Sequence, residues 1–419
     1  MKLNISKKIF FVENKDFQTI QIRVLFPFEE KEKDIAKIAL LPNLLIYMNE
    51  EYNTEEKYQK AKMENMIQAI NCSRIMIGTT GYLSFNLLIP DTHSLRKNIL
   101  EKQIKFFEKM IYHPKIINQG FDPFEVEREI NSLTMAIENN SKKINFYQAR
   151  KGLELIDKDG ILSRSIDNHQ EQLKEITPQN LYEYYLKIIK NKTPMIFVMG
   201  NVDKQEITEY INKYLYKKNT KVQYKIDLNY NYFQSPNKDI QRVSETSNFK
   251  SSSLSLYYKV ENMKKSDAIY LELIRNLLAS LSSHLLNKKL RNEYELIYSS
   301  KVIDYPNFGI FEITVHIDKD KKDITEEKIQ EVLENLKDPE FIAPYLENIK
   351  NRKRINLLRL SDDKFSILSD YMKKTLKIEK KAEEQYKQIK QIKPQEIADF
   401  INRLKLDTVY FIEEETHEH

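Results

Sequence analysis

Hydrophobic residues alternate with polar ones in two segments that lie far apart along the chain. Residues 18–28 (QTIQIRVLFPF) and residues 252–260 (SSLSLYYKV) have the period of two that is typical of a half-buried strand. Each strand pattern is followed by apolar positions at helical spacing, through Leu45 in the first case and over residues 267–281 in the second. The order of strand and helix therefore occurs twice, which predicts two related halves.

A second repeated signal lies near the middle and near the end of the chain. Residues 174–203 and 387–415 each contain a Pro-Gln pair, an amphipathic helix pattern and then an apolar strand. Thr177 has the chemistry of a helix N-cap, with Pro178 at the first helical position, and Pro394 has the same place in the later segment. These signals predict where two of the helices begin.

The repeats predict the domain organisation. We expect an N-terminal domain over residues 1–220 and a C-terminal domain over residues 246–419. They are joined by residues 221–245, which are polar and lack a clear helical period.

The first half also shows how each domain is built. Residues 82–90 alternate as a strand, and two long amphipathic helices follow, near 93–112 and 123–139. Leu95, Ile99, Ile104 and Phe107 are the residues of the first of these helices that we expect to face inward. The pattern predicts an α+β fold in each half, a mostly antiparallel sheet with helices packed on one face.

Composition excludes several classes of function. The chain has 419 residues, a net charge of +5 with interleaved signs, and a single cysteine, Cys72. We therefore expect no nucleic-acid partner, no membrane partner and no disulfide, which fits a reducing cytoplasmic location. The charged run 373–390 is interpreted as a solvated helix face. None of the seven histidines is spaced to pair with another on a helix, and no phosphate loop is present.

The ordered set of signals resembles one family of peptidases. Residues 121–140 (FDPFEVEREINSLTMAIENN), followed by the Pro-Gln helix and strand near 176–203, are similar to the insulinase-like (pitrilysin, M16) metallopeptidases, in particular their small bacterial branch. The resemblance extends over nearly the whole chain. It implies two homologous α+β halves that together form half of a clamshell around a peptide.

In active members of that family, a His-x-x-Glu-His helix and a later glutamate bind zinc. Two histidines four residues apart share one helix face, and the glutamate between them activates a water. The resemblance places these positions at Ala39, Pro42 and Asn43, with the later Glu-Glu pair at Met135 and Ala136. None of these side chains is a good zinc ligand, and we expect no metal in this chain. Ile35, Ile38, Leu41, Leu45 and Met48 recur at helical spacing and predict a core helix, with a kink at Pro42.

The second half resembles the segment of the family that reaches toward the bound peptide. Leu290-Arg291 and Tyr298 match this signature, whereas Asn292 replaces its usual acid and Glu295 replaces its turn glycine. A tyrosine hydroxyl can donate a hydrogen bond to a developing oxyanion, and an arginine can hold a substrate carbonyl. The resemblance therefore implies that Arg291 and Tyr298 act on a peptide.

The combination of lost ligands and retained Arg291 and Tyr298 predicts a non-catalytic subunit. We expect a heterodimer with a zinc-bearing M16 homologue, in which this chain closes the peptide chamber and contributes both residues during processing of a peptide or leader. Zinc is then expected in the partner only. One alternative is a homodimeric peptide-binding or scaffold protein without proteolysis, and another is an independent hydrolase with an unfamiliar site.

Overall fold

The computed structural model describes most of the chain, namely residues 2–5, 9–29, 31–46, 49–77, 80–91, 99–158, 160–190, 192–216, 224–227, 232–279, 285–360, 362–376 and 380–415. Met48, Leu95 and His284 lie outside the described residues. The chain divides into two units that interleave along the sequence. Unit 1 comprises Met1–Ile137, Arg164–Asn229 and Lys364–Glu379, and unit 2 comprises Glu138–Ser163, Tyr230–Asp363 and Lys380–His419.

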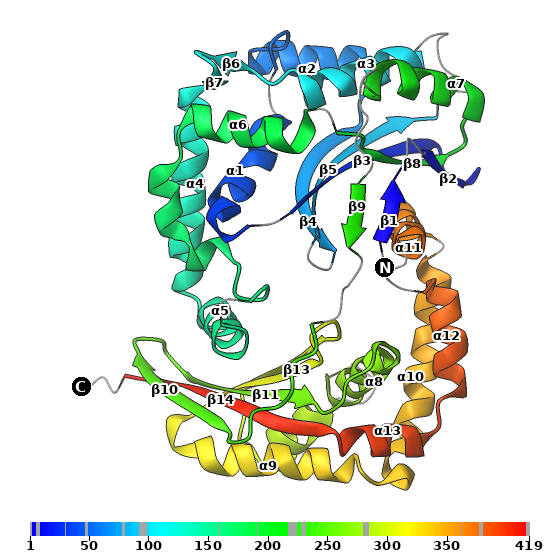
Figure 1. Ribbon diagram of the computed structural model, residues 1–419. Coiled ribbons are helices and arrows are strands. Elements are labelled where there is room, and N and C mark those ends of the chain that lie inside the picture. The colour runs from blue at the N-terminus through cyan, green and yellow to red at the C-terminus, as the bar shows by residue number, and fades with distance from the viewer. Residues whose placement is uncertain are drawn as a thin grey trace. The chain divides into compact units, whose positions relative to one another are not determined.

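Unit 1 is built on a five-stranded sheet with the strand order β2-β8-β3-β5-β4 (Figure 1). Only β2 and β8 are parallel, and the other pairs are antiparallel. Its strands are β2 (Ile9–Glu13), β3 (Thr19–Glu29), β4 (Ala69–Ile77), β5 (Thr80–Pro90) and β8 (Met195–Gly200). Its helices are α1 (Ile35–Leu45), α2 (Glu55–Glu64), α3 (Ile99–Tyr112), most of α4 (Pro123–Ser141), α6 (Pro178–Ile189), α7 (Lys204–Tyr210) and α11 (Lys364–Thr375). Two small pairs, β1 (Lys2–Ile5) with β9 (Tyr224–Asp227) and β6 (Ile116–Ile117) with β7 (Gly120–Phe121), complete the unit.

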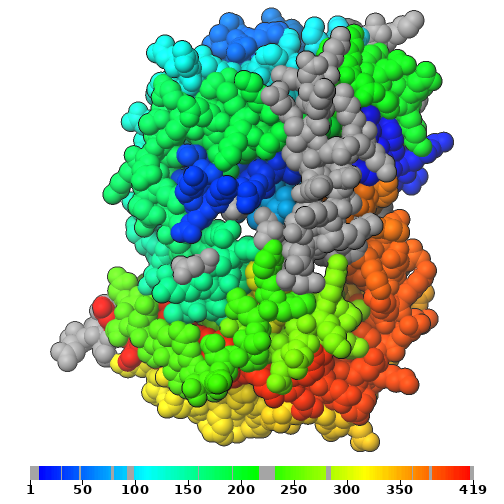
Figure 2. Space-filling view, viewed as in Figure 1, coloured from blue at the N-terminus to red at the C-terminus, as the bar shows by residue number. Residues whose placement is uncertain are grey.

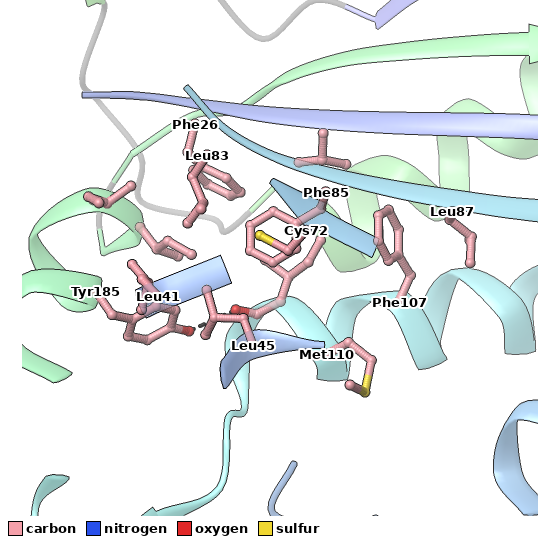
Figure 3. Packing of buried hydrophobic residues seen from close by; sticks show 14 of the residues in the cluster. Phe26, Leu41, Leu45, Cys72, Leu83, Phe85, Leu87, Phe107, Met110 and Tyr185 are labelled. Atoms are coloured by element: carbon pink, nitrogen blue, oxygen red, sulfur yellow. Dashed lines mark hydrogen bonds between the residues drawn. The ribbon is translucent and has the colours of Figure 1, made fainter. Parts of the chain in front are cut away.

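The hydrophobic core of unit 1 lies between this sheet and the helices α1, α3 and α6 (Figure 3). Leu41 and Leu45 of α1 belong to one cluster with Phe85 of β5 and Phe107 of α3, and all four side chains are buried (Figure 3). The hydroxyl of Tyr185 on α6 donates a hydrogen bond to the main-chain oxygen of Ile111 at 2.7 Å (Figure 3). The apolar stripe predicted for α1 is therefore a packing face, as its helical spacing indicated.

Unit 2 repeats the same topology, with the strand order β10-β14-β11-β13-β12. Again only the outermost pair, β10 with β14, is parallel. Its strands are β10 (Gln241–Ser247), β11 (Ser252–Val260), β12 (Ser299–Tyr305), β13 (Ile310–Ile317) and β14 (Leu404–Glu414). Its helices are α5 (Ile144–Ile156), α8 (Ala268–Ala279), α9 (Lys322–Asn335), α10 (Pro339–Leu360), α12 (Ala382–Gln391) and α13 (Pro394–Ile401), together with a π-helix over Asn287–Glu293. The orange helices α10 and α12 form part of its surface (Figure 2).

The predicted fold class is confirmed, since each unit has a mostly antiparallel sheet with its main helices on one face. The helix starts are confirmed as well. The Thr177 hydroxyl accepts a hydrogen bond from the Asn180 N–H, and the Asn180 side chain accepts one from the Thr177 N–H, both at 3.1 Å. This capping box satisfies main-chain donors that the first turn leaves unpaired.

One helix in each unit packs on the second face of the sheet, and the sequence pattern did not predict it. In unit 1 this helix is α11, where Met372 contacts Arg23 of β3. In unit 2 it is α5, where Gly152 packs directly on Tyr257 of β11. The interpretation of the charged run 373–390 as one solvated helix face is wrong. The run includes the end of α11 and most of α12, and Ile389 of α12 is buried. No described helix is long and apolar enough to cross a membrane.

Candidate functional site

Helix α1 carries Ala39, Pro42 and Asn43, the three positions to which the family resemblance assigns the zinc-binding motif. It follows β3 directly in the chain, and its buried residues Ile38, Leu41 and Leu45 fix it against the sheet. This orientation leaves Ala39 half-buried and Asn43 exposed. Pro42 is buried inside the helix, which continues to Leu45. The structure gives no measure of the predicted kink, which stays a prediction.

Helix α4 lies beside Asn43 and offers a carboxylate to it. Nδ2 of Asn43 donates a hydrogen bond to Oε2 of Glu129 at 3.1 Å. The other oxygen of Glu129 lies 3.1 Å from Nη2 of Arg128, which also pairs with Glu125 at 2.6 Å. Hydrogen bonds and ion pairs thus already engage the polar groups between α1 and α4.

A small hollow lies next to this contact. Its lining comes from both helices and from the loop before α4, and the residues are Asn43, Leu44, Lys115, Phe121, Asp122, Glu125 and Arg128. Lys115 Nζ and Asp122 Oδ2 form an ion pair at 2.7 Å in its wall. The charges in the hollow are therefore balanced within the chain.

The donor set at these positions does not fit a zinc ion. Ala39 and Ala136 offer no donor atom, Pro42 lacks even a main-chain N–H, and Asn43 offers only a neutral amide. Met135 and Ala136 on α4 are both exposed, so the second ligand helix presents no carboxylate at the place where the family has its Glu-Glu pair. Over the described part of the chain, no three His, Cys, Asp or Glu side chains gather closely enough to hold a metal ion.

Arg291 lies in the π-helix Asn287–Glu293 of unit 2. Leu290 beside it is fully buried and anchors the helix, whereas the Arg291 side chain is exposed. Among the described residues, no hydrogen bond or ion pair engages its guanidinium group. The Arg291 guanidinium group is thus a charged hydrogen-bond donor without an acceptor among the described residues.

The turn between Arg291 and Tyr298 has the geometry that a glycine normally supplies. Glu295 has a φ of 53°, in the left-handed region. The N–H of Leu296 donates to the main-chain oxygen of Leu290 at 2.7 Å and closes the turn. The resemblance places Glu295 where the family has a turn glycine, and the backbone of Glu295 has a conformation that glycine adopts readily.

Tyr298 leaves this turn at the start of β12 and is 57% exposed. Its N–H donates to the main-chain oxygen of His316 at 2.9 Å, which fixes the backbone, and its hydroxyl donates to Oδ1 of Asp318. This hydrogen bond raises the pKa of Tyr298, and together with Lys321, 3.0 Å from Asp318, it lowers the pKa of Asp318. The tyrosine is thus held as a protonated donor.

His316 and His169, two of the histidines in the described part of the chain, are engaged in local contacts. His316 in β13 lies 2.7 Å from Oδ1 of Asn145 on α5, and burial lowers its pKa. Nδ1 of His169 donates to the main-chain oxygen of Ser165 at 2.9 Å, which makes His169 part of a local turn. The Asn43–Glu129 contact was missed by sequence reasoning, since no local signal links residues that lie 86 positions apart.

Comparison with known proteins agrees with this picture. Residues 175–353 match the family model described as "Peptidase M16 inactive domain". The "Probable inactive metalloprotease YmfF" of Bacillus subtilis (strain 168) is 21% identical over 207 residues, which is 48% of this chain and 48% of that protein. The matched part thus spans about half the length of this curated relative.

Solved structures share the whole fold. A conserved protein from Enterococcus faecalis V583 superposes with a TM-score of 0.86 at 18% identity, covering 100% of both chains. A peptidase M16 inactive domain from Pseudomonas fluorescens gives a TM-score of 0.72 at 12% identity, covering 100% of this chain and 99% of that one. The resemblance to the M16 peptidase family is confirmed. The chain is thus similar to M16 peptidases in fold, and its residues 175–353 are similar to a domain that is described as inactive.

Proposed function

We propose that this chain is the non-catalytic subunit of a heterodimeric M16-type zinc peptidase. Its partner is a zinc-bearing homologue, and together they enclose a peptide or leader segment for processing in the cytoplasm. In this proposal residues 1–220 and 246–419 are the two homologous halves, joined by residues 221–245.

One observation carries the proposal. Both units share one strand order, and solved M16-like structures share the fold, while the positions that the resemblance assigns to zinc carry Ala39, Pro42, Asn43 and Ala136, none of which is a good zinc ligand. The Asn43–Glu129 hydrogen bond occupies the space between these helices instead. A subunit that forms part of a peptide chamber requires this fold, whereas a protein that binds no peptide does not.

Arg291 and Tyr298 are the residues that we propose this chain contributes to the partner's site. The guanidinium group of Arg291 is exposed and has no acceptor among the described residues, so it is available to bind a carbonyl oxygen of the peptide. The Tyr298 hydroxyl exchanges Asp318 for the oxygen that becomes negative during cleavage. The partner's zinc supplies the activated water.

The test is reconstitution of activity from two purified proteins. Mixing this chain with its zinc-bearing homologue should yield peptide hydrolysis that neither protein shows alone. Tyr298→Phe should lower kcat by about a hundredfold, the usual effect of removing one oxyanion donor, and Arg291→Ala should lower kcat/KM.

Matched variants separate these roles from general damage. Tyr294→Phe removes a tyrosine hydroxyl that donates to Glu331 at 3.2 Å, and Lys288→Ala removes an exposed cation of the same π-helix. Both should retain the full rate. If Arg291→Ala and Tyr298→Phe also retain it, the assigned roles are wrong. If the two proteins do not associate but this chain still binds peptides, it is a homodimeric peptide-binding protein instead.

A further inference from the structure

The second face of β3 carries polar side chains under α11. Thr19, Gln21 and Arg23 alternate with the buried residues of the core face. Lys364 at the start of α11 donates to the Thr19 hydroxyl at 3.1 Å, and Met372 near its end lies 3.8 Å from Nη1 of Arg23. Side chains from both ends of α11 thus contact side chains of β3.

Among the described residues, Arg23 has no counter-charge on this face of the sheet. Its Nε donates to Oδ1 of Asn86 at 2.5 Å, and its other partner is the Met372 sulfur. No carboxylate lies within ion-pair distance of it in the described part of the chain. The side chain is half-buried, and desolvation lowers the pKa of Arg23. Such a charge is costly to bury and is normally paired with an anion.

Two neighbouring strands hold this guanidinium group in place. Arg23, Asn86 and Asn71 are directly opposite one another across β3, β5 and β4. Nδ2 of Asn86 donates to Oδ1 of Asn71 at 2.9 Å and lies 3.4 Å from the Ser84 hydroxyl, so the carbonyl oxygen of Asn86 faces Arg23. Asn71 is exposed on the edge strand β4, which leaves this row open to solvent at one end.

A second polar group on the same face is also unused. Gln21 is 1% exposed, and neither atom of its side-chain amide has a partner among the described residues. It lies two residues before Arg23, between Thr19 and Arg23 on the same face of β3. The side-chain amide of Gln21 is thus available for a further hydrogen bond on the same face of β3 as the Arg23 guanidinium group.

We propose that Arg23, supported by Asn86 and Asn71, is an oxyanion-binding subsite that takes the carboxylate of a peptide. A guanidinium group matches the two oxygens of a carboxylate in a bidentate pair. A carboxylate also balances the single positive charge of Arg23. A phosphate dianion would instead bring a second negative charge close to the neutral amides of Asn86 and Asn71. The inference rests on the proposed function only in taking a peptide as the source of the carboxylate, and it needs neither Arg291 nor a partner chain.

Three probes and calorimetric titration test the subsite on the isolated full-length chain. They are N-acetyl-tetra-alanine with a free C-terminal carboxylate, the same peptide with a C-terminal amide, and inorganic phosphate. The carboxylate peptide should bind at least about tenfold more tightly than the amide, as expected for a charged hydrogen-bonded pair. Arg23→Gln should abolish this preference. Arg74→Gln, which removes an exposed arginine at a β4 position opposite Leu83 of the core face, should leave it intact.

A second variant keeps the test decisive if Arg23→Gln folds poorly. Asn86→Asp places an internal carboxylate beside Arg23, so it should raise the melting temperature and also abolish the carboxylate preference. Retained preference in Asn86→Asp would overturn the proposal, as would equal binding of both peptides to the unaltered chain. Arg23-dependent binding of phosphate without any carboxylate preference would overturn the assignment to a peptide. None of these results bears on reconstitution with a partner.

Discussion

The side chain of Asn43 on α1 donates a hydrogen bond to Glu129 on α4 over 3.1 Å, and this contact joins the two helices that would carry a metal site. Asn43 is exposed, and Ala39 lies one turn before it on the same side of α1. The two helices that the resemblance assigns to the metal site are thus joined by a hydrogen bond between an amide and a carboxylate.

Restoring two histidines should restore metal affinity but not catalysis. The double variant Ala39→His/Asn43→His places two imidazoles four residues apart on one helix face, which is a zinc-binding arrangement. It should bind Zn²⁺ at least tenfold more tightly than Asn43→His alone, measured by titration calorimetry. It should not hydrolyse peptides, because Pro42 supplies no carboxylate to activate water. Equal affinities of the double and single variants would contradict the placement of these positions.

Glu295→Gly should stabilise the protein. Glu295 has a φ of 53°, where a side chain costs roughly 1–2 kcal/mol and glycine does not. The flexibility of glycine in the unfolded chain offsets part of this gain, so we expect an increase of about 0.5–1 kcal/mol in the free energy of unfolding, measured by urea denaturation. The Lys321 ammonium, 3.2 Å from the main-chain oxygen of Glu295, remains able to bind it. Glu295→Ala serves as the control and should change stability little.

Gly152→Ala should destabilise unit 2 by loosening α5. An added Cβ would lie 1.8 Å from the Tyr257 hydroxyl oxygen and 2.5 Å from its Cζ, so helix and sheet must separate. Overpacking of this kind costs about 1–3 kcal/mol. Tyr257→Phe removes the nearest atom, and we expect the double variant to recover part of the loss in a double-mutant cycle. Strictly additive effects of the two changes would argue against this packing.

Glu312 should make stability depend on pH. Its carboxyl group is 2% exposed and accepts hydrogen bonds from Thr314 and Tyr305, both at 2.9 Å. Burial raises the pKa of Glu312 above the ordinary value of 4.5. The folded state therefore binds more protons than the unfolded state in the range above that value, and stability falls as pH rises through it.

The variant Glu312→Gln isolates this contribution. Relative to the unaltered chain, its free energy of unfolding should increase between pH 5 and pH 8, the range over which we would measure it. Glu331→Gln is the control, since the hydrogen bond from Lys328 lowers the pKa of the exposed Glu331, and its difference should be constant over this range. A constant difference for Glu312→Gln as well would show that this carboxyl is ionised in both states.

Local signals in the sequence predicted most of the fold. The Thr177 cap, the end of α1 at Leu45 and the strand over 252–260 all depend on residues close together in the chain, and the structure confirms each of them. The repeated order of strand and helix likewise corresponds to the same strand order in both sheets.

Contacts between distant segments were not predictable in this way. Helices α5 and α11 pack on sheets whose central strands lie far away in the sequence. The hydrophobic pattern of each helix does not indicate on which sheet it packs. Gly152 meets Tyr257, and Arg23 meets Met372 across 349 positions. The positions at Ala39, Pro42, Asn43 and Ala136 came from family resemblance, because a lost ligand leaves no chemical signal of its own.

The metal content of the isolated protein tests the central claim most directly. After saturation with Zn²⁺ and removal of free ion, elemental analysis should find far less than one zinc per chain, and the preparation should not cleave peptides. Activity should arise only when the zinc-bearing homologue is added. One tightly held zinc per isolated chain, with peptide hydrolysis that disappears when the ion is stripped, would contradict the account.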